Sequence, residues 1–139
     1  MKDFKSMITA STEETQKLGE SFSKNLKPGN IVALIGNLAA GKTSFVKGVL
    51  KGLGYKYEVT SPTFTLINEY YAKLKVIHVD FYREENITRW NELGFQNMIN
   101  SDSIILIEWA DLIPDLLPNI DYKLHFEHNG EDKRRIEIR

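Results

Sequence analysis

Eight consecutive residues, Gly36 to Thr43, have the types and spacing of a loop that binds phosphate groups. Four residues separate Gly36 from Gly41, and Lys42 and Thr43 follow directly. In a loop of this pattern the backbone N–H groups point toward the phosphates, and the lysine reaches the β- and γ-phosphates. The hydroxyl of the last residue binds Mg²⁺. The pattern therefore predicts that this segment binds a nucleoside triphosphate together with magnesium.

The segments on either side of this loop have the patterns of a strand and a helix. Ile31 to Ile35 is an unbroken apolar run, typical of a strand buried on both faces of a parallel sheet. After the loop, apolar residues recur on one side of a helix that stops at Gly54. A helix that begins at the loop adds its partial positive charge to the phosphate site. The expected nucleotide contacts in this segment are Asn37, Leu38, Ala39, Ala40, Gly41, Lys42, Thr43 and Ser44.

Two acidic residues, Asp80 and Glu108, each close a short and largely apolar run elsewhere in the chain. Open α/β sheets bind ligands at the carboxyl ends of their strands, so both carboxylates are expected beside the loop. A carboxylate there can hold Mg²⁺ through water, or orient the water that attacks the γ-phosphate. We predict that Asp80, Glu108 and Lys42 are catalytic and that Thr43 and Glu108 bind magnesium. The sequence does not divide the metal and water roles between the two acids.

Several of these side chains also have a purely structural interpretation. Asp80 has the position of a cap for the residues that follow it, and Glu108 that of a rim carboxylate paired with a lysine. Trp109 is either a core residue or an aromatic wall beside the nucleotide. Thr63 follows a Ser-Pro pair in a loop where many such proteins sense the γ-phosphate, or it belongs to an ordinary turn. His78 is interpreted as structural, or as a support for a ligand-binding side chain.

The strings that identify other nucleotide-binding classes are absent or weak in this sequence. It contains neither the Asp-x-x-Gly nor the Asn-Lys-x-Asp string that is typical of GTPases. A small-molecule kinase would usually carry an arginine-rich lid, and here only Arg83 and Arg89 flank one short segment. The absence of the GTPase strings argues against a GTPase, and no adenine-reading motif can be defended from spacing alone. Besides ATP hydrolysis, two functions stay open: a small-molecule phosphotransferase and a non-catalytic regulator that senses ATP.

Four strings taken together make the chain resemble one known family. They are the Gly36–Thr43 loop, Ser61-Pro62-Thr63-Phe64, His78-Val79-Asp80-Phe81-Tyr82-Arg83 and Glu108-Trp109. In this order and spacing they resemble the bacterial TsaE (YjeE) family, small ATPases required for threonylcarbamoyladenosine modification of tRNA. The resemblance runs from Leu18-Gly19-Glu20 to the end of the chain.

This resemblance implies a slow, Mg²⁺-dependent ATPase that works with proteins of the TsaB and TsaD type. Those proteins form the complex that transfers threonylcarbamoyl to adenosine in tRNA, and ATP hydrolysis would support turnover of that complex. The resemblance also implies that Thr12 lies near the adenine, and that Thr63, Asp80 and Trp109 contact the nucleotide.

The loop departs from the family's common sequence at two positions. Asn37 and Ala39 stand where the family usually has Asp and Gly. If position 39 requires a positive φ, alanine there costs roughly 1 kcal/mol.

The bulk composition bounds the setting in which this chemistry takes place. A chain of 139 residues with 42% hydrophobic and 27% charged residues is ordinary for one soluble globular domain, which we place at residues 1–139. No apolar run approaches the ~18 residues of a membrane span, and the first ten residues lack the core of a signal peptide. We expect a cytoplasmic protein with no membrane contact. A net charge of −1 gives no basic surplus for RNA, so tRNA is expected only through partner proteins.

The remaining patterns predict a mixed α/β fold. We expect a single P-loop NTPase domain with a mostly parallel central sheet, flanked by helices and carrying antiparallel hairpins. The expected elements are an edge strand at 4–9, a helix opened by the capping box 11–14, a hairpin of 64–71 with 75–81, a helix at 89–93, a helix after Gly94, a strand at 103–108 and a closing hairpin of 122–126 with 135–139.

Overall fold

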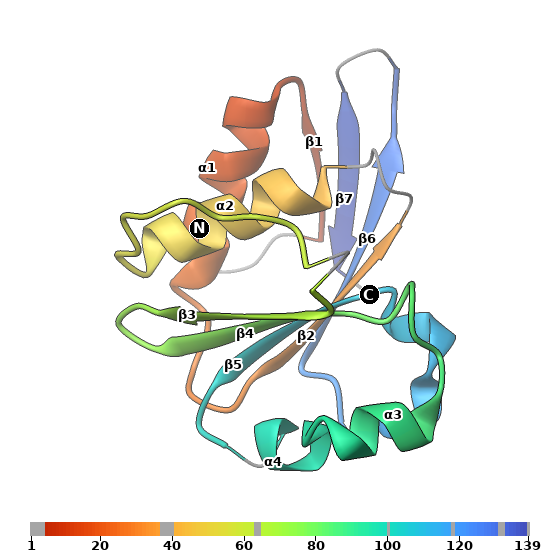
Figure 1. The fold of residues 1–139 in the computed structure, drawn as a ribbon. Coiled ribbons are helices and arrows are strands. Elements are labelled where there is room, and N and C mark those ends of the chain that lie inside the picture. The colour runs from red at the N-terminus through yellow and green to blue at the C-terminus, as the bar shows by residue number, and fades with distance from the viewer. Residues whose placement is uncertain are drawn as a thin grey trace.

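The computed structural model describes residues 5–36, 41–62, 65–99, 101–117, 119–130 and 133–138, and its centre is a seven-stranded sheet (Figure 1). The middle strands pair in parallel, and the antiparallel pairs lie toward the edges. The predicted parallel sheet is therefore confirmed at the centre, and the two predicted hairpins supply antiparallel pairs on either side. The spatial order is β1 (Ser6–Thr9), β7 (Arg134–Ile138), β6 (Tyr122–His128), β2 (Ile31–Gly36), β5 (Ile104–Glu108), β4 (Lys75–Asp80) and β3 (Ile67–Tyr71).

Helices cover both faces of this sheet (Figure 1). One face carries α1 (Thr12–Ser23) and α2 (Lys42–Gly52), and the other carries α3 (Ile87–Glu92) and α4 (Phe95–Ile99). Two 3₁₀ turns, Ala110–Leu112 and Pro114–Leu116, follow β5. None of the helices in the described ranges is long and apolar enough to cross a bilayer.

Alternate residues of the central strands enter two separate cores, as the period of two in a strand requires. On β2, Val32 and Leu34 belong to the core under α1 and α2, whereas Ala33 belongs to the core under α3 and α4. Phe45 of α2 and Trp90 of α3 are fully buried in the first and the second core, respectively. The unbroken apolar run of β2 is thereby explained, because both of its faces are covered.

The predicted capping box opens α1. The side chain of Ser11 accepts a hydrogen bond of 3.1 Å from the N–H of Glu14, and the Glu14 carboxylate accepts one of 2.9 Å from the N–H of Ala10. The helix ends at Ser23, and Leu26 is buried in the turn beyond it.

Glycines allow α1 and α2 to pack closely against each other. A β-carbon at Gly48 would overlap the carbonyl oxygen of Gln16, and one at Gly19 would overlap that of Phe45. This close packing holds the first turn of α1 beside the first turn of α2, which follows the phosphate loop. Residues from two distant parts of the sequence therefore reach the same place.

Candidate phosphate-binding site

Three neighbouring parallel strands, β2, β5 and β4, end side by side where the predicted phosphate loop begins. Glu108 at the end of β5 is in register with Leu34 of β2 and with Asp80 of β4. The residues two positions earlier, Leu106 and His78, are also in register and share this face of the sheet. On the α2 side of the sheet, apolar side chains thus give way to the titratable side chains His78, Asp80 and Glu108 toward the carboxyl ends of the strands. This is the edge at which α/β proteins bind ligands.

Lys42 lies at the centre of this region with only 1% of its surface exposed. Its Nζ donates a 2.6 Å hydrogen bond to the carbonyl oxygen of Gly36 and lies 3.7 Å from Oε1 of Glu108. The same ammonium group is 4.3 Å from the centre of the Trp109 ring, a cation–π distance. The lysine of the motif is therefore held between the loop, an acid and an aromatic ring.

Glu108 is held from its other side by His78. Oε2 of Glu108 is 2.7 Å from Nε2 of His78, which has no exposed surface. Burial acts to raise the pKa of Glu108, but His78 and then Lys42 outweigh it, so this pKa lies below its ordinary value. Glu108 is consequently a carboxylate at neutral pH. The sequence left His78 open between a structural role and a supporting one, and its contact with Glu108 favours the second.

The charge balance around Lys42 is different. Burial lowers the pKa of Lys42 below its ordinary value, because the ammonium group has lost most of its water. Glu108, Asp80 and Asp111 oppose this shift and stabilise the charged form, but they do not cancel it. The charged form of Lys42 is thus destabilised by the loss of its hydration, and a bound anion would offset this loss.

Asp80 is buried, with 1% of its surface exposed, and it caps the turn after β4. Its Oδ1 accepts a 2.8 Å hydrogen bond from the N–H of Tyr82. The structural interpretation of Asp80 is therefore correct for one of its oxygens. Its place in register with Glu108 still puts the carboxylate beside the candidate site, so the catalytic prediction remains open.

Trp109 packs against a core and also faces Lys42, and its predicted contact with the nucleotide stays a prediction. Its ring packs against the core under α3 and α4 and lies 4.9 Å from the ring of Tyr82, while its face meets Lys42. The backbone of Trp109 has φ = 59°, an uncommon value for a bulky residue, and among the described residues its buried indole N–H has no hydrogen-bond partner. Strained backbone and orphaned donors are concentrated at functional sites.

The segment before β3 is hydrogen-bonded to the backbone of Asp80. The N–H of Leu66 donates to the carbonyl of Pro62 at 2.7 Å, and the carbonyl of Leu66 accepts from the N–H of Asp80 at 3.0 Å. Leu66 itself has φ = 68°, a second uncommon conformation next to the site. Thr63 lies outside the described residues, so its predicted role stays a prediction.

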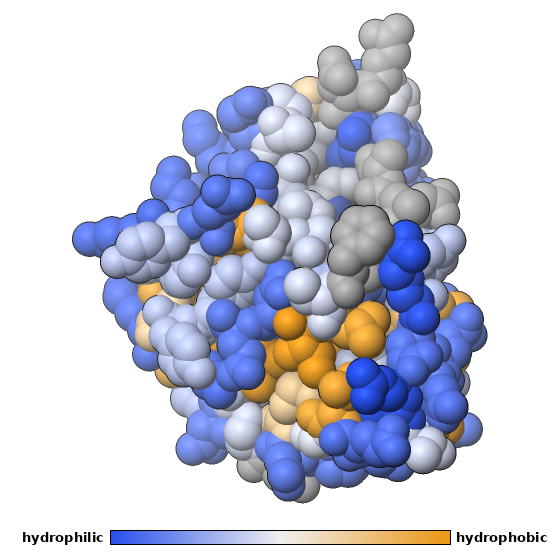
Figure 2. Space-filling model, in the orientation of Figure 1, coloured by the Kyte–Doolittle hydropathy of each residue, from blue (hydrophilic) through white to orange (hydrophobic). Residues whose placement is uncertain are grey.

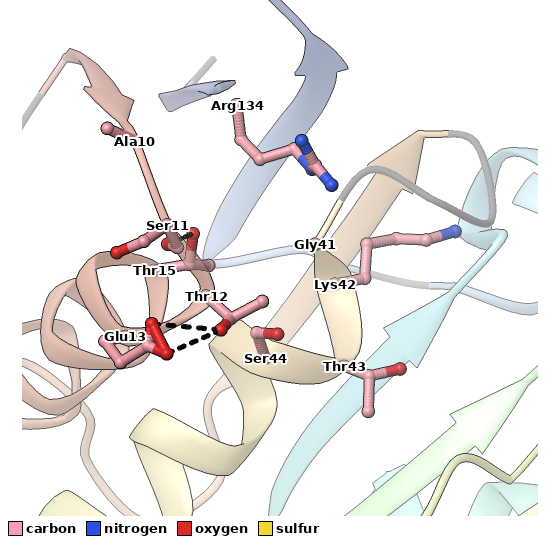
Figure 3. A pocket seen from close by; sticks show the side chains of 10 residues that line it. All are labelled: Ala10, Ser11, Thr12, Glu13, Thr15, Gly41, Lys42, Thr43, Ser44 and Arg134. Atoms are coloured by element: carbon pink, nitrogen blue, oxygen red, sulfur yellow. Dashed lines mark hydrogen bonds between the residues drawn. The ribbon is translucent and has the colours of Figure 1, made fainter. Parts of the chain in front are cut away.

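A pocket of about 520 Å³ opens beside the first turn of α2 (Figure 3). Thr12, predicted to lie near the adenine, lines it together with the predicted contacts Gly41, Lys42, Thr43 and Ser44. Figure 3 shows the Lys42 side chain leaving this turn on the side away from Thr12. Asp80, Glu108 and Trp109 are not among the described residues that line the pocket. Glu108 and Trp109 contact the far end of Lys42 instead.

Arg134 is a candidate contact that the sequence did not reveal. It comes from β7, lines the same pocket as Thr12, and its side-chain carbons lie close to Gly41. Within the described residues its Nε is buried without a hydrogen-bond partner. No spacing in the sequence points to Arg134, because only the pairing of β7 with β6 and β1 brings it here.

The residues present fit a triphosphate with Mg²⁺. Gly41 has φ = 92° and no side chain with which to cap α2, so within the described ranges the first N–H groups of this helix are available to an anion. Thr43, Asp80 and Glu108 supply the oxygen atoms that Mg²⁺ prefers. Asn37, Leu38, Ala39 and Ala40 lie outside the described residues, and their predicted contacts stay predictions.

Comparison with known proteins points to a single family. The family model described as "Threonylcarbamoyl adenosine biosynthesis protein TsaE" matches residues 9–136. The tRNA threonylcarbamoyladenosine biosynthesis protein TsaE of Treponema pallidum is 34% identical over 131 residues, which are 94% of this chain and 97% of the relative. The protein of the same name in Bacillus subtilis is 38% identical over 129 residues, 92% of this chain and 80% of the relative.

A solved structure gives the same result. The crystal structure of Bacillus subtilis YdiB matches with a TM-score of 0.79 and 34% identity, over 96% of this chain and 82% of that one. The similarity thus covers both the sheet and the helices that carry the site.

Proposed function

Because the chain belongs to the TsaE family of tRNA threonylcarbamoyladenosine biosynthesis proteins, we propose that it is a P-loop ATPase that supports this modification of tRNA. In this proposal the chain binds ATP with Mg²⁺ and hydrolyses the bond to the γ-phosphate. Its partners are the threonylcarbamoyl-transferase proteins of the TsaB and TsaD type, and its nucleotide cycle drives their turnover.

The observation that carries this proposal is the position of Lys42. A buried ammonium group lies at the start of α2, bound to a loop carbonyl at 2.6 Å and facing Glu108 at 3.7 Å. A lysine whose pKa is lowered by burial gains most from a ligand with several negative charges. The γ-phosphate of ATP is such a ligand, and Lys42 would exchange the Gly36 carbonyl for phosphate oxygens.

Catalysis in this proposal rests on positioning and electrostatics, without a covalent intermediate. Lys42 and the N–H groups at the start of α2 stabilise negative charge that develops on the phosphate oxygens. Bound Mg²⁺ would supply further positive charge, with Thr43 and Glu108 as its protein ligands, directly or through water. Glu108 has its position fixed by His78 and Lys42 before any ligand arrives.

The low pKa of Glu108 limits what this carboxylate can do. A carboxylate that holds its proton weakly is a poor general base, so it serves by orienting water or magnesium rather than by removing a proton outright. Asp80, whose Oδ1 is bound to the Tyr82 N–H, lies beside Glu108 and can share this work.

Phosphate release with and without the transferase proteins tests the proposed function. We expect slow release by the chain alone, a clear rise with TsaB- and TsaD-type proteins, and a loss of at least about 10²-fold for Lys42→Ala. Lys123→Ala is the matched control, because Lys123 is an exposed lysine outside the pocket.

Other outcomes would favour the alternatives. A rise on adding a hydroxyl-bearing metabolite, with none from the proteins, would identify a phosphotransferase. Binding of ATP without any phosphate release, even with the partner proteins, would identify an ATP-sensing regulator.

A further inference from the structure

Six lysines from separate parts of the sequence gather on the outer side of α1 and α2. We call this surface the lysine face; its members are Lys17, Lys24, Lys47, Lys51, Lys56 and Lys73. All six are exposed. Two adjoining hollows, of about 590 Å³ and 510 Å³, lie on this surface and share Lys51 in their linings. Lys73 adjoins the first hollow, because its side chain lies next to Gly54, which lines it.

The lysine face carries a strong local positive charge. Within the described part of the chain none of its six ammonium groups takes part in an ion pair. The acidic residues that line the two hollows are Glu20 and Glu58. Five lysines and two acids therefore line the hollows, although the whole chain has a net charge of −1. In Figure 2 the surface over α1 and α2 is mainly hydrophilic, and strongly hydrophobic residues gather below it.

Two tyrosines stand among these lysines. Tyr57 is 79% exposed, and its ring lies 5.6 Å from that of Tyr55 in an edge-on arrangement. Tyr55 is itself braced by Tyr70 at 5.1 Å, and Tyr70 is buried. An exposed ring supported from behind and surrounded by lysines has the features of a platform on which a nucleic-acid base stacks.

We propose that the lysine face binds RNA, with lysines on the phosphate backbone and Tyr57 on an unpaired base. Lysines without acidic partners are typical of phosphate contacts, whereas lysine is depleted in protein–protein interfaces. The names of this chain's relatives place their process on tRNA, so tRNA is the expected RNA.

The RNA site is separate from the nucleotide pocket but close to it. Thr15 and Ser44 line the nucleotide pocket, and their near neighbours Gln16 and Lys47 line the first hollow. No described residue that lines the nucleotide pocket also lines either hollow. RNA binding can be measured on the intact chain alone, independently of any ATPase activity.

The test is the affinity of the full chain for a transcribed tRNA over a series of salt concentrations. For the triple variant Lys47→Gln, Lys51→Gln, Lys56→Gln we expect a Kd at least tenfold higher near 0.1 M salt, and a log–log salt slope shallower by about 2 to 3. Tyr57→Ala should weaken binding at least about fivefold and leave the salt slope unchanged, because a base contact without charge is lost.

A triple variant elsewhere, Lys5→Gln, Lys123→Gln, Lys133→Gln, removes the same charge from exposed positions outside the lysine face. It should change the salt slope little, and melting curves should show that both triple variants are folded. The proposal is overturned if the wild type does not bind tRNA even at low salt, or if both triple variants weaken binding equally. It is also overturned if poly-glutamate binds as tightly as tRNA, or if the lysine-face variant loses only stimulation by partner proteins.

Discussion

The two faces of the central sheet use the same strands for different purposes. On the α2 side, β4 and β5 carry His78, Asp80 and Glu108 toward their carboxyl ends, where Glu108 contacts both His78 and Lys42. On the α3 side, the neighbouring positions are occupied by apolar residues such as Val79 and Ile107, both fully buried. Successive residues of a strand point to opposite faces of the sheet, so a candidate site residue and a core residue can be direct neighbours in the sequence.

Among the residues that the structure describes, the buried charged side chains Lys42, Asp80 and Glu108 all lie on the α2 face. Each charged group on the α2 side contacts a group of opposite sign or a hydrogen-bond partner, which reduces the cost of burying it. The α3 side is stabilised by ring contacts such as the one between Phe81 and Trp90 at 5.0 Å. Mutations on the two faces should consequently affect different measurements.

The largest effect is expected for Glu108→Gln on the α2 face. This change keeps the shape of the side chain and removes its negative charge. We expect kcat for ATP hydrolysis to fall by roughly 10²- to 10³-fold, equivalent to about 3 to 4 kcal/mol of transition-state stabilisation. The apparent affinity for ATP should change far less. Equal losses in affinity and kcat would show that Glu108 acts in binding, which would weaken the assigned role.

Gly48→Ala tests whether the close packing of α1 on α2 stabilises the α2 side of the sheet. The added β-carbon would overlap the carbonyl oxygen of Gln16, and overpacking of this kind costs about 2 kcal/mol of unfolding free energy. Denaturant titration measures this loss. The adjacent, exposed change Lys47→Ala is the control and should stay within about 0.5 kcal/mol of the wild type.

Ile107→Val changes the packing face at the position next to Glu108. Removing one methylene from a fully buried residue should cost about 1 kcal/mol of unfolding free energy. Because Ile107 faces away from Lys42, kcat of the folded enzyme should not change. A drop in kcat comparable to that of Glu108→Gln would contradict the division of labour between the two faces.

The smallest expected effect is on the acid side of the stability profile. The pKa of Glu108 is lowered below its ordinary value of 4.5, so its carboxylate stabilises the fold above that pH. This contribution is lost as the pH falls from 4.5 through the lowered pKa of the folded state. Unfolding free energies measured across this range should fall more steeply for the wild type than for Glu108→Gln. Parallel curves would show that the contacts of Glu108 with His78 and Lys42 do not stabilise the folded chain.

Local patterns in the sequence predicted much of this fold. The capping box at Ser11, the apolar run of β2 and the hairpins all depend on residues near one another in the chain, and each is present. The sequence also placed Asp80 and Glu108 at the carboxyl ends of strands, and the structure adds that the two residues pair in register.

The parts that could not be predicted depend on contacts between distant segments. The approach of Arg134 to Gly41 results from strand pairing at the far end of the chain. The contact of His78 with Glu108 requires the register of β4 with β5, which an isolated histidine does not reveal. The net charge of −1 argued against direct contact with RNA. Lysines that are interspersed with acidic residues along the sequence nevertheless gather on one surface of the folded chain, and the sequence alone does not show this lysine face.

The most direct test of the central claim is calorimetric titration of the wild-type chain with ATP and Mg²⁺. Phosphate binding around Lys42 predicts saturable heat with about one nucleotide per chain, and much weaker binding for Lys42→Ala. An absence of heat and of saturation at nucleotide concentrations on the order of 1 mM would contradict the phosphate site, and the proposed ATPase function with it.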